Sequence, residues 1–294
     1  MRVNKLIIIV CMFLLSLSLV NAANTCTTCN QTCSPCGGGC TTTNMEDMFM
    51  GVVNFNNTIG DITLWNTSCV TSMVGMFDQA TDFNQNIGNW NVGNVRDMSG
   101  MFNSATNFNK NLNSWNTSSV SNMSWMFQET QLFNGDISSW DVSHVVNMES
   151  MFSFAQSFNQ NIGGWNTSNV TDMNNMFYTS YAFNQPINSW DVRRVRQMSG
   201  MFNGAYSFNQ NIGGWNTSNV TDMSYMFFDS GLGMSAFNQD ISGWDVKKVT
   251  DMTSMFEDAS NFDQNLGSWN VSNVASMNDM FKNSGLSTSN YNNI

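Results

Sequence analysis

Hydrophobic positions recur along this chain in one fixed pattern. From Met45 onward the unit reads F-N-Q-N-I-x-x-W-[ND]-[TV]-x-x-V-x-x-M-x-x-M-F-x-x-A, with tryptophans at positions 65, 90, 115, 140, 165, 190, 215, 244 and 269. The step is 25 residues, except for one of 29, where four extra residues lie near Gly231–Ser235. Self-similarity over this length is typical of repeat proteins, in which each unit packs against its neighbours.

One part of the unit predicts a short helix. Met98, Met101, Phe102 and Ala105 fall at i, i+3, i+4 and i+7, which places them on one helical face. In eight of the nine units, the residue before the first Met is of a type that caps helix N-termini. These candidate caps are Ser72, Asp97, Asn122, Asn147, Asp172, Asp222, Asp251 and Ser276. We therefore expect two to three turns of helix in each unit.

A second part of the unit, such as Phe83 to Ile87, predicts a short strand. Asn and Gln are weak strand formers on their own. When identical strands stack about 4.8 Å apart, however, amide side chains can hydrogen-bond along the stack. The main amide column is Asn84, Asn109, Asn134, Asn159, Asn184, Asn209 and Asn238.

One strand and one helix per unit predict an α/β fold. We expect a right-handed, leucine-rich-repeat-like solenoid of about nine 25-residue strand–helix repeats. Phe, Ile, Trp, Val and Met should form continuous ladders in its core. The Met and Trp stripes are accordingly interpreted as core and not as a cofactor site.

The N-terminal region divides into two segments ahead of the solenoid at 45–294. Residues 1–22 resemble a secretory signal peptide, with Arg2 and Lys5 before an apolar stretch from Leu6 to Val20. An uncleaved anchor is the alternative, but the stretch is short for a membrane span. No later segment is apolar for long enough to span a membrane. These features predict a secreted or cell-surface protein.

Residues 23–44 predict a disulfide-rich N-terminal cap. Cleavage of the signal peptide would remove Cys11 and leave six of the seven cysteines. An even number of cysteines in an exported chain suggests disulfides, whose pairing the spacing leaves open. A thiolate metal site is the competing interpretation, because two C-x-x-C pairs are present. Cys69 lies in the first repeat and would tie the cap to the solenoid. The disulfide candidates are Cys26, Cys29, Cys33, Cys36, Cys40 and Cys69.

Composition and charge exclude several classes of function. The 294 residues include only 11% charged ones, and the net charge is −11, which is unfavourable for nucleic-acid binding. No G-x-S-x-G nucleophile motif, Walker phosphate loop or H-E-x-x-H metal motif is present. Carboxylates such as Asp136, Asp141, Asp240 and Asp245 could serve glycoside hydrolysis, but they recur as parts of the repeat. We therefore expect neither an enzyme nor a bound cofactor.

Candidate contact residues follow from the differences between units. Asn66, Asn116, Asn166 and Asn216 lie in N-x-[ST] glycosylation motifs on alternate units; the alternative is that Asn-Thr-Ser simply forms a turn. Partner contacts are predicted where single units depart from the repeat. The alternative for the basic residues is that they are solvated loop charges, and the alternative for the aromatic residues is that they only cover the surface of their own unit. These positions are Arg193, Arg194, Lys247, Lys248, Trp125 and Tyr225.

The repeated W-x-x-x-x-V-x-x-M-x-x-M-F pattern resembles the repeats of BspA-like leucine-rich-repeat surface proteins of bacteria and protists. The resemblance covers nearly all of residues 45–283 and implies a non-enzymatic recognition or adhesion module for extracellular protein or glycan partners. It implies no catalytic residue. The alternative hypothesis is a structural coat or fibre, formed when solenoids of several copies stack by self-association.

Overall fold

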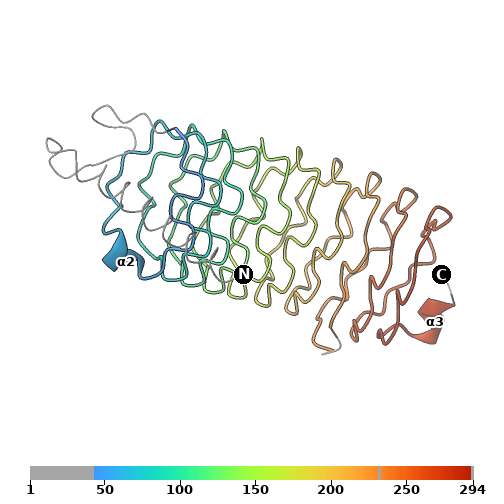
Figure 1. Cartoon of the computed structure of the whole chain (residues 1–294). Helices are drawn as coiled ribbons and strands as arrows, with labels where there is room; N and C mark the ends of the chain where they lie inside the picture. The colour runs from blue at the N-terminus through green and yellow to red at the C-terminus, as the bar shows by residue number, and fades with distance from the viewer. Residues whose placement is uncertain (1–42, 231–232, 293–294) are drawn as a thin grey trace, which may run out of the picture.

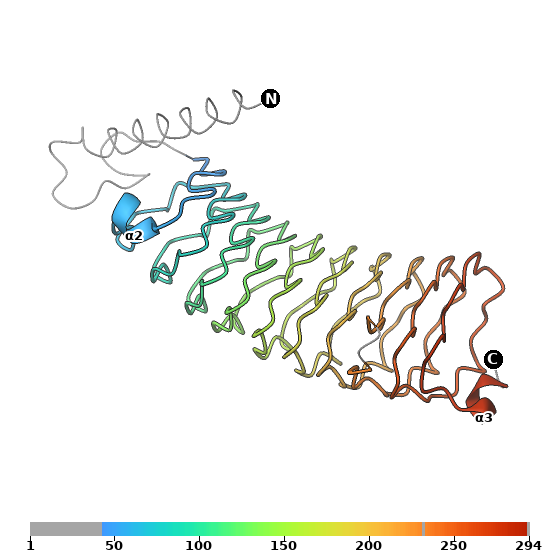
Figure 2. The same cartoon turned by 60° about the horizontal axis from the view of Figure 1, so that its bottom comes forward.

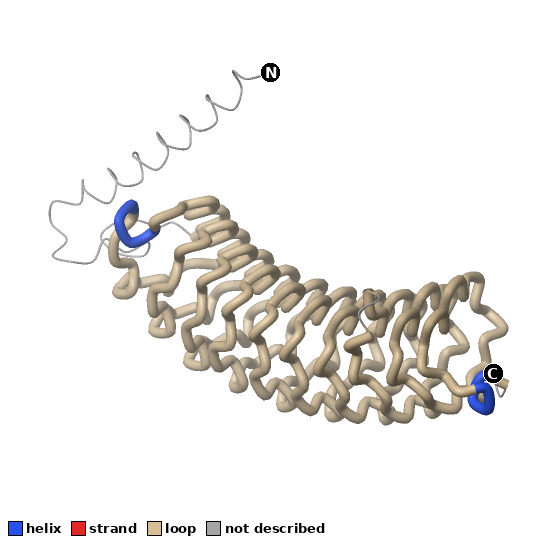
Figure 3. The backbone as a smooth tube through the Cα atoms, turned by 90° about the horizontal axis from the view of Figure 1, so that it is seen from below, coloured by secondary structure: helices blue, strands red, loops and turns tan. Residues whose placement is uncertain are grey.

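The structure is a computed structural model that describes residues 43–230 and 233–292. Figure 1 shows the chain winding through a row of similar coils between the two short helices α2 (Phe55–Thr58) and α3 (Thr288–Tyr291). These helices lie at opposite ends of the row (Figure 2). The row is elongated and gently bent along its length (Figure 3). The described part of the chain has no helix long and apolar enough to cross a membrane.

One β-bridge links each pair of neighbouring coils. Nine isolated parallel bridges run from Asn44↔Ser72 to Asp251↔Ser276 through the described coils. Around each bridge, backbone N–H groups donate to the following coil, and an N–H of the following coil donates back, as Val146 does to the carbonyl of Ser121 at 2.9 Å. The N–H of Met148 donates to the carbonyl of Asp172 at 3.0 Å, and that of Phe152 to the carbonyl of Met176 at 2.9 Å. Each coil is thus held in register with the next by its backbone.

The segments predicted as helices are runs of turns. The N–H of Met101 donates to the carbonyl of Met98 at 3.2 Å, three residues back, and Ala105 does the same to Phe102 at 3.0 Å. Gly100 and Ser104 have positive φ angles of 60° and 55°. A right-handed helix of L-residues needs negative φ throughout, so the backbone cannot continue as a helix. The i, i+3, i+4, i+7 spacing arises here because successive turns place apolar side chains inward.

The residues expected to cap helices form the bridges instead. Six of the eight, the Asp and Asn residues, do accept a backbone N–H, but from two residues on, as in an Asx turn. Asp97 Oδ1 accepts from the N–H of Ser99 at 2.9 Å, and Asp172 Oδ1 from that of Asn174 at 2.9 Å. Local side-chain bonding of this kind competes with helix formation. The same short polar side chains therefore favour turns in this chain.

The segments predicted as strands carry no backbone ladder, but the asparagine column is confirmed. Asn134 Oδ1 accepts from the N–H of Asn159 at 3.0 Å, and Asn159 Oδ1 accepts from the N–H of Asn184 at 3.0 Å. The side-chain amide replaces the carbonyl that a β-ladder would supply. The predicted α/β strand–helix solenoid is therefore wrong for the described residues, although the 25-residue units do stack.

Aromatic ladders fill the interior, which confirms the prediction that Met, Phe and Trp stripes form the core. Phe127 and Phe152 stack at a centroid distance of 5.7 Å, and Phe127 packs on Phe133 of its own coil at 4.0 Å. Trp140 and Trp165 lie 6.4 Å apart with their rings 3° from parallel. The Nε1–H of Trp140 donates to the buried carbonyl of Leu112 in the preceding coil at 2.9 Å.

The tryptophan bond predicts a large cost for its removal. Trp140→Phe deletes the donor to Leu112 and leaves a space in the stack, so the free energy of unfolding should fall by about 2–4 kcal/mol. Trp125→Phe is the matched control, because Trp125 is 40% exposed and its change should cost less than about 0.5 kcal/mol. Urea denaturation measures both, and equal losses would contradict the assigned role of the core tryptophans.

Candidate functional site

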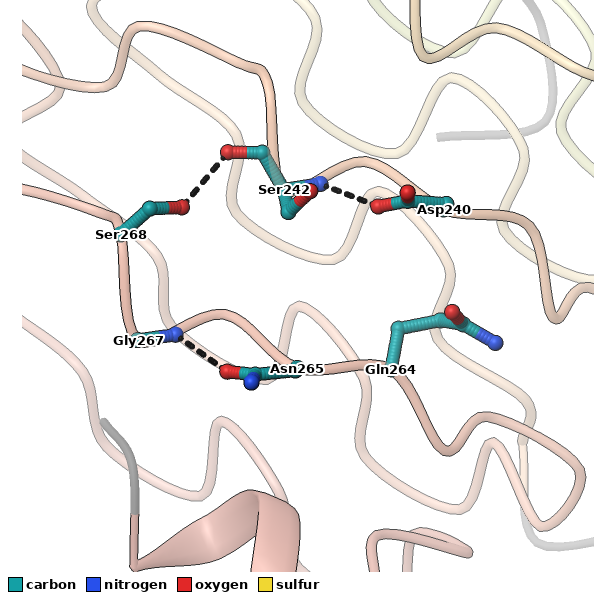
Figure 4. A pocket seen from close by; sticks show the side chains of 6 residues that line it. All are labelled: Asp240, Ser242, Gln264, Asn265, Gly267 and Ser268. Atoms are coloured by element: carbon teal, nitrogen blue, oxygen red, sulfur yellow. Dashed lines mark hydrogen bonds between the residues drawn. The ribbon is translucent and has the colours of Figure 1, made fainter.

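A shallow polar pocket lies where two neighbouring coils turn before their tryptophans (Figure 4). Ser268 Oγ donates to the carbonyl of Ser242 at 2.7 Å, and Asp240 and Asn265 each accept a backbone N–H two residues on. A similar pocket occurs at the equivalent positions of two earlier coils, lined by Asn86, Gly88, Asn89, Trp90, Asn111, Asn113 and Ser114. Because the pocket recurs with the repeat, we interpret it as a feature of the coil and not as a unique site.

The carboxylates considered for glycoside hydrolysis are turn-forming groups. Asp136, Asp141, Asp240 and Asp245 each accept the backbone N–H of the residue two positions on. Hydrogen bonds from Ser143 lower the pKa of Asp141, and those from Ser242 lower the pKa of Asp240. A general acid needs a raised pKa, so these shifts are opposite to those expected of such a group.

Histidine and metal chemistry find little support in the same region. His144 is exposed, and its Nδ1 lies 3.3 Å from the hydroxyl of the adjacent Ser143. Over residues 43–230 and 233–292, no group of three or more His, Cys, Asp or Glu side chains is placed to hold a metal ion. Cys69 is half-buried and is not a free thiol. The other five candidate cysteines lie outside the described residues, so the disulfide pairing stays a prediction.

The four glycosylation candidates lie at exposed turns. Asn116 Oδ1 accepts from the N–H of Ser118 at 3.2 Å, while the hydroxyl of the intervening Thr117 is directed inward and donates to the carbonyl of Asp141 at 2.9 Å. The same arrangement recurs at Asn66, Asn166 and Asn216. The Asn-Thr-Ser sequence therefore has a structural role in the turn, and glycosylation of these exposed side chains stays a prediction.

Three of the four predicted basic contacts are already engaged within the protein. Arg193 forms an ion pair with Asp191 at 2.6 Å, which lowers the pKa of Asp191. Arg194 donates to Asn169 Oδ1 at 2.7 Å, and Lys248 donates to Asn219 Oδ1 at 2.6 Å, each across to the preceding coil. Lys247 is exposed. These side chains lie at the turns that follow Trp190 and Trp244, which we call the basic corner. They do not come together with the two aromatic candidates.

The aromatic candidates lie on a different surface, which we call the turn face. It consists of residues 96–107 of one coil and the equivalent stretches 43–54, 71–82, 121–132, 146–157, 171–182, 196–207, 221–236, 250–261 and 275–286, as far as these are described. Trp125 and Tyr225 occupy the same position of the turn as Gly75, Gly100 and Gly200, and all five have positive φ angles. The two aromatic side chains are 40% and 42% exposed.

Sequence reasoning missed five further aromatic residues on the turn face. Phe154 and Tyr178 make an edge contact at 5.0 Å, Tyr181 stacks on Tyr206 at 5.0 Å, and Phe228 contacts Tyr225 at 5.9 Å. These pairs lie in neighbouring coils or within one coil, between Trp125 and Phe228. The signal was present in the sequence, because most other units have polar or charged residues or glycine at these positions. We call these seven residues the aromatic row.

A family model described as "Mycoplasma protein of unknown function, DUF285" matches residues 40–133, 107–208 and 186–294. The chain belongs to the DUF285 family. The three overlapping matches agree with the repeated unit of the sequence and with the stacked coils. None of the curated proteins compared with the chain matches it. Membership of DUF285 supports a repeat protein.

Backbone conformation predicts that two members of the aromatic row are dispensable for folding. A non-glycine residue at positive φ is strained, so Trp125→Gly and Tyr225→Gly should leave the free energy of unfolding unchanged or raise it by up to about 1 kcal/mol. Gln128→Gly, in the same turn as Trp125 but without a positive φ, should lower it by about 0.5–1 kcal/mol. Thermal or urea unfolding measures all three, and an equal loss in Trp125→Gly and Gln128→Gly would contradict this.

Glu149 on the turn face predicts a pH dependence. Burial raises the pKa of Glu149, and the negative charge of Asp172 adds to the rise. A carboxyl whose pKa is higher in the folded state binds a proton on folding, so its ionisation above that pKa destabilises the fold. Glu149→Gln should therefore raise stability at neutral pH, by up to about 1 kcal/mol, and the gain should shrink towards about pH 4. Thermal unfolding across this range tests it; a gain independent of pH would contradict it.

Proposed function

We propose that this protein is an exported or cell-surface recognition module, with its partner docked on the turn face. The observation that carries the proposal is the aromatic row. Interior positions of the described coils repeat with little change, whereas seven other turn positions from Trp125 to Phe228 are aromatic, three of them exposed and four half-buried. Exposed Trp and Tyr residues are enriched at the energetic centres of protein interfaces.

Backbone strain supports the same proposal. The fold admits glycine at the position of Trp125 and Tyr225, as Gly75, Gly100 and Gly200 demonstrate in other coils. Large side chains at positive φ persist in proteins mainly where they serve a function, because the fold alone would favour glycine. Both aromatic side chains keep about two fifths of their surface exposed, which is available to a partner. Their presence is therefore best explained by a contact made outside the chain.

Export and adhesion rest on the sequence. The predicted signal peptide at residues 1–22 and the cysteine-rich segment after it suit a secreted or surface location, but both lie outside the described residues, apart from residues 43–44. The resemblance to BspA-like repeats supports a role in adhesion without a catalytic site. The ordered stack supplies a rigid, extended platform, which is how repeat proteins generally present binding surfaces.

An array of extracellular proteins and glycans tests this function. The purified full-length chain should bind at least one array component saturably, and Trp125→Gly with Tyr225→Gly should weaken that binding about 10-fold or more. Tyr291→Ala is the matched control, because Tyr291 is 61% exposed but lies in α3.

Binding to no component would contradict a recognition role. Binding that both variants retain equally would contradict the turn face as its location. Light scattering of the same samples addresses self-association, the alternative: a mass that rises with concentration would favour stacking of copies.

A further inference from the structure

Charge is distributed unevenly around the coils. The turn face carries 14 of the chain's 21 acidic residues but only three of the eight basic residues in the described chain, a formal charge of −11. Two of the 14, Asp229 and Glu257, are buried. The remaining surface of the described coils carries seven acidic and five basic residues, a formal charge of −2. The turn face is therefore strongly negative, although the protein as a whole has few charged residues.

Carboxylates flank the aromatic row. Glu129 lies in the same turn as Trp125, and the N–H of Trp125 donates to the backbone carbonyl of Glu149 in the next coil at 2.8 Å. Asp222 lies three residues before Tyr225, with Oδ1 accepting from Ser224. Acidic residues thus lie in the same turns as the exposed rings and in the coil bonded to Trp125.

The protein's own cations leave most of this charge uncompensated. Among the described residues of the turn face, ion pairs are formed by Lys282, with Glu257 and, at 4.0 Å, with Asp279. Elsewhere on the face, like charges approach one another: burial raises the pKa of Asp78, and the charge of Asp47 raises it further. Glu149 and Asp172 show the same effect. A positively charged partner would relieve this repulsion.

Lysine and arginine side chains match both features of the surface. Ammonium and guanidinium groups are attracted to the faces of Trp and Tyr rings, and they pair with carboxylates. Trp125 and Tyr225 are four coils apart, which corresponds to roughly 20 Å at about 4.8 Å per coil. An extended peptide of about six residues covers that length. A neutral glycan would use the rings but would gain nothing from the charge.

We propose that the turn face binds an extended, Lys- and Arg-rich polypeptide segment, with its cationic side chains on the aromatic row and its charge balanced by the flanking carboxylates. The proposal deepens the proposed function and rests on it. The basic corner formed by Arg193, Arg194, Lys247 and Lys248 lies outside this face. Its charges disfavour docking of such a segment there and so help to restrict the partner to the turn face.

The chain itself supplies a variant that removes charge with little structural change. Asp97, Asp172, Asp222 and Asp251 occupy the bridge column, where neighbouring coils have Asn122 and Asn147. Changing these four residues to Asn keeps a side-chain oxygen for each turn. The matched control changes Asp136, Asp141, Asp240 and Asp245 to Asn, at turns outside the face where other coils have asparagine, such as Asn86 and Asn91. Both sets alter the net charge equally.

Fluorescence anisotropy with the full-length chain tests the proposal. The probe is a labelled peptide of about twelve residues alternating Arg and Ser, compared with its Glu–Ser counterpart. The Arg–Ser peptide should bind, its affinity should fall with added salt, and the Glu–Ser peptide should not bind. The turn-face set should weaken binding about 10-fold or more, and the control set less than about twofold. Melting curves verify that both variants fold.

Two results would overturn the inference. The first is no binding of the Arg–Ser peptide, and the second is equal weakening by both variant sets, which would indicate attraction to net charge alone. The experiments distinguish failure of this inference from failure of the proposed function. If an array component binds through Trp125 and Tyr225 while the Arg–Ser peptide does not bind, the recognition role stands and the cationic partner is wrong.

Discussion

Each coil is bound to the next by backbone hydrogen bonds. Along the turn segments, N–H groups of one coil donate to carbonyls of the following one, and beside each bridge an N–H of the following coil donates back, as Val146 does to Ser121 at 2.9 Å. The bonds from Met148 to Asp172 and from Phe152 to Met176 are one instance of the turn-segment bonds, and they recur every 25 residues with few exceptions. This register places identical side chains directly above one another. Phenylalanine and tryptophan ladders, and the asparagine column, exist because the backbone sets that spacing. A buried position can therefore change only at a cost to both neighbours.

The same constraint separates structure from function on this molecule. Interior residues are fixed by stacking, and most polar residues at the corners are used for bonds between or within coils, as Thr117 and Asn159 illustrate. Exposed positions of the turn face are less constrained, although some of them also bond between coils, as Glu129 does when its side chain accepts from the hydroxyl of Ser104. It is there that single coils depart from the pattern, with Trp125, Tyr181 and Tyr225, and there that negative charge accumulates. A rigid interior with a variable outer face suits a protein that recognises a partner.

The repeat, its period and its core were predictable from the sequence, because aligned Phe, Met and Trp residues have no other way to be buried. The asparagine column was predictable for a similar reason: stacked amides must find partners along the stack. The sequence wrongly predicted a helix in each unit. Met98, Met101, Phe102 and Ala105 have helical spacing, but the positive φ angles of Gly100 and Ser104 and the bonds to the next coil make a run of turns. Spacing alone does not reveal whether an N–H bonds within its segment or across to a neighbouring coil.

Of the candidate site residues, Trp125 and Tyr225 could be found because glycine occupies their position in other units. Their aromatic neighbours lie at positions of low sequence regularity, and only the fold brings Phe154 to Tyr178 and Tyr181 to Tyr206. The basic residues were singled out for their charge, but the ion pair of Arg193 with Asp191 became visible only in three dimensions. Charge asymmetry around the coils likewise required knowing which stretches share a face.

The central claim is that the turn segments bond to the next coil and do not form helices. Scalar couplings measured by NMR across hydrogen bonds test it most directly, because they identify the donor and acceptor of each bond. The account predicts a coupling from the amide nitrogen of Phe152 to the carbonyl carbon of Met176. A coupling from that nitrogen to the carbonyl carbon of Met148, four residues back as in an α-helix, would contradict it.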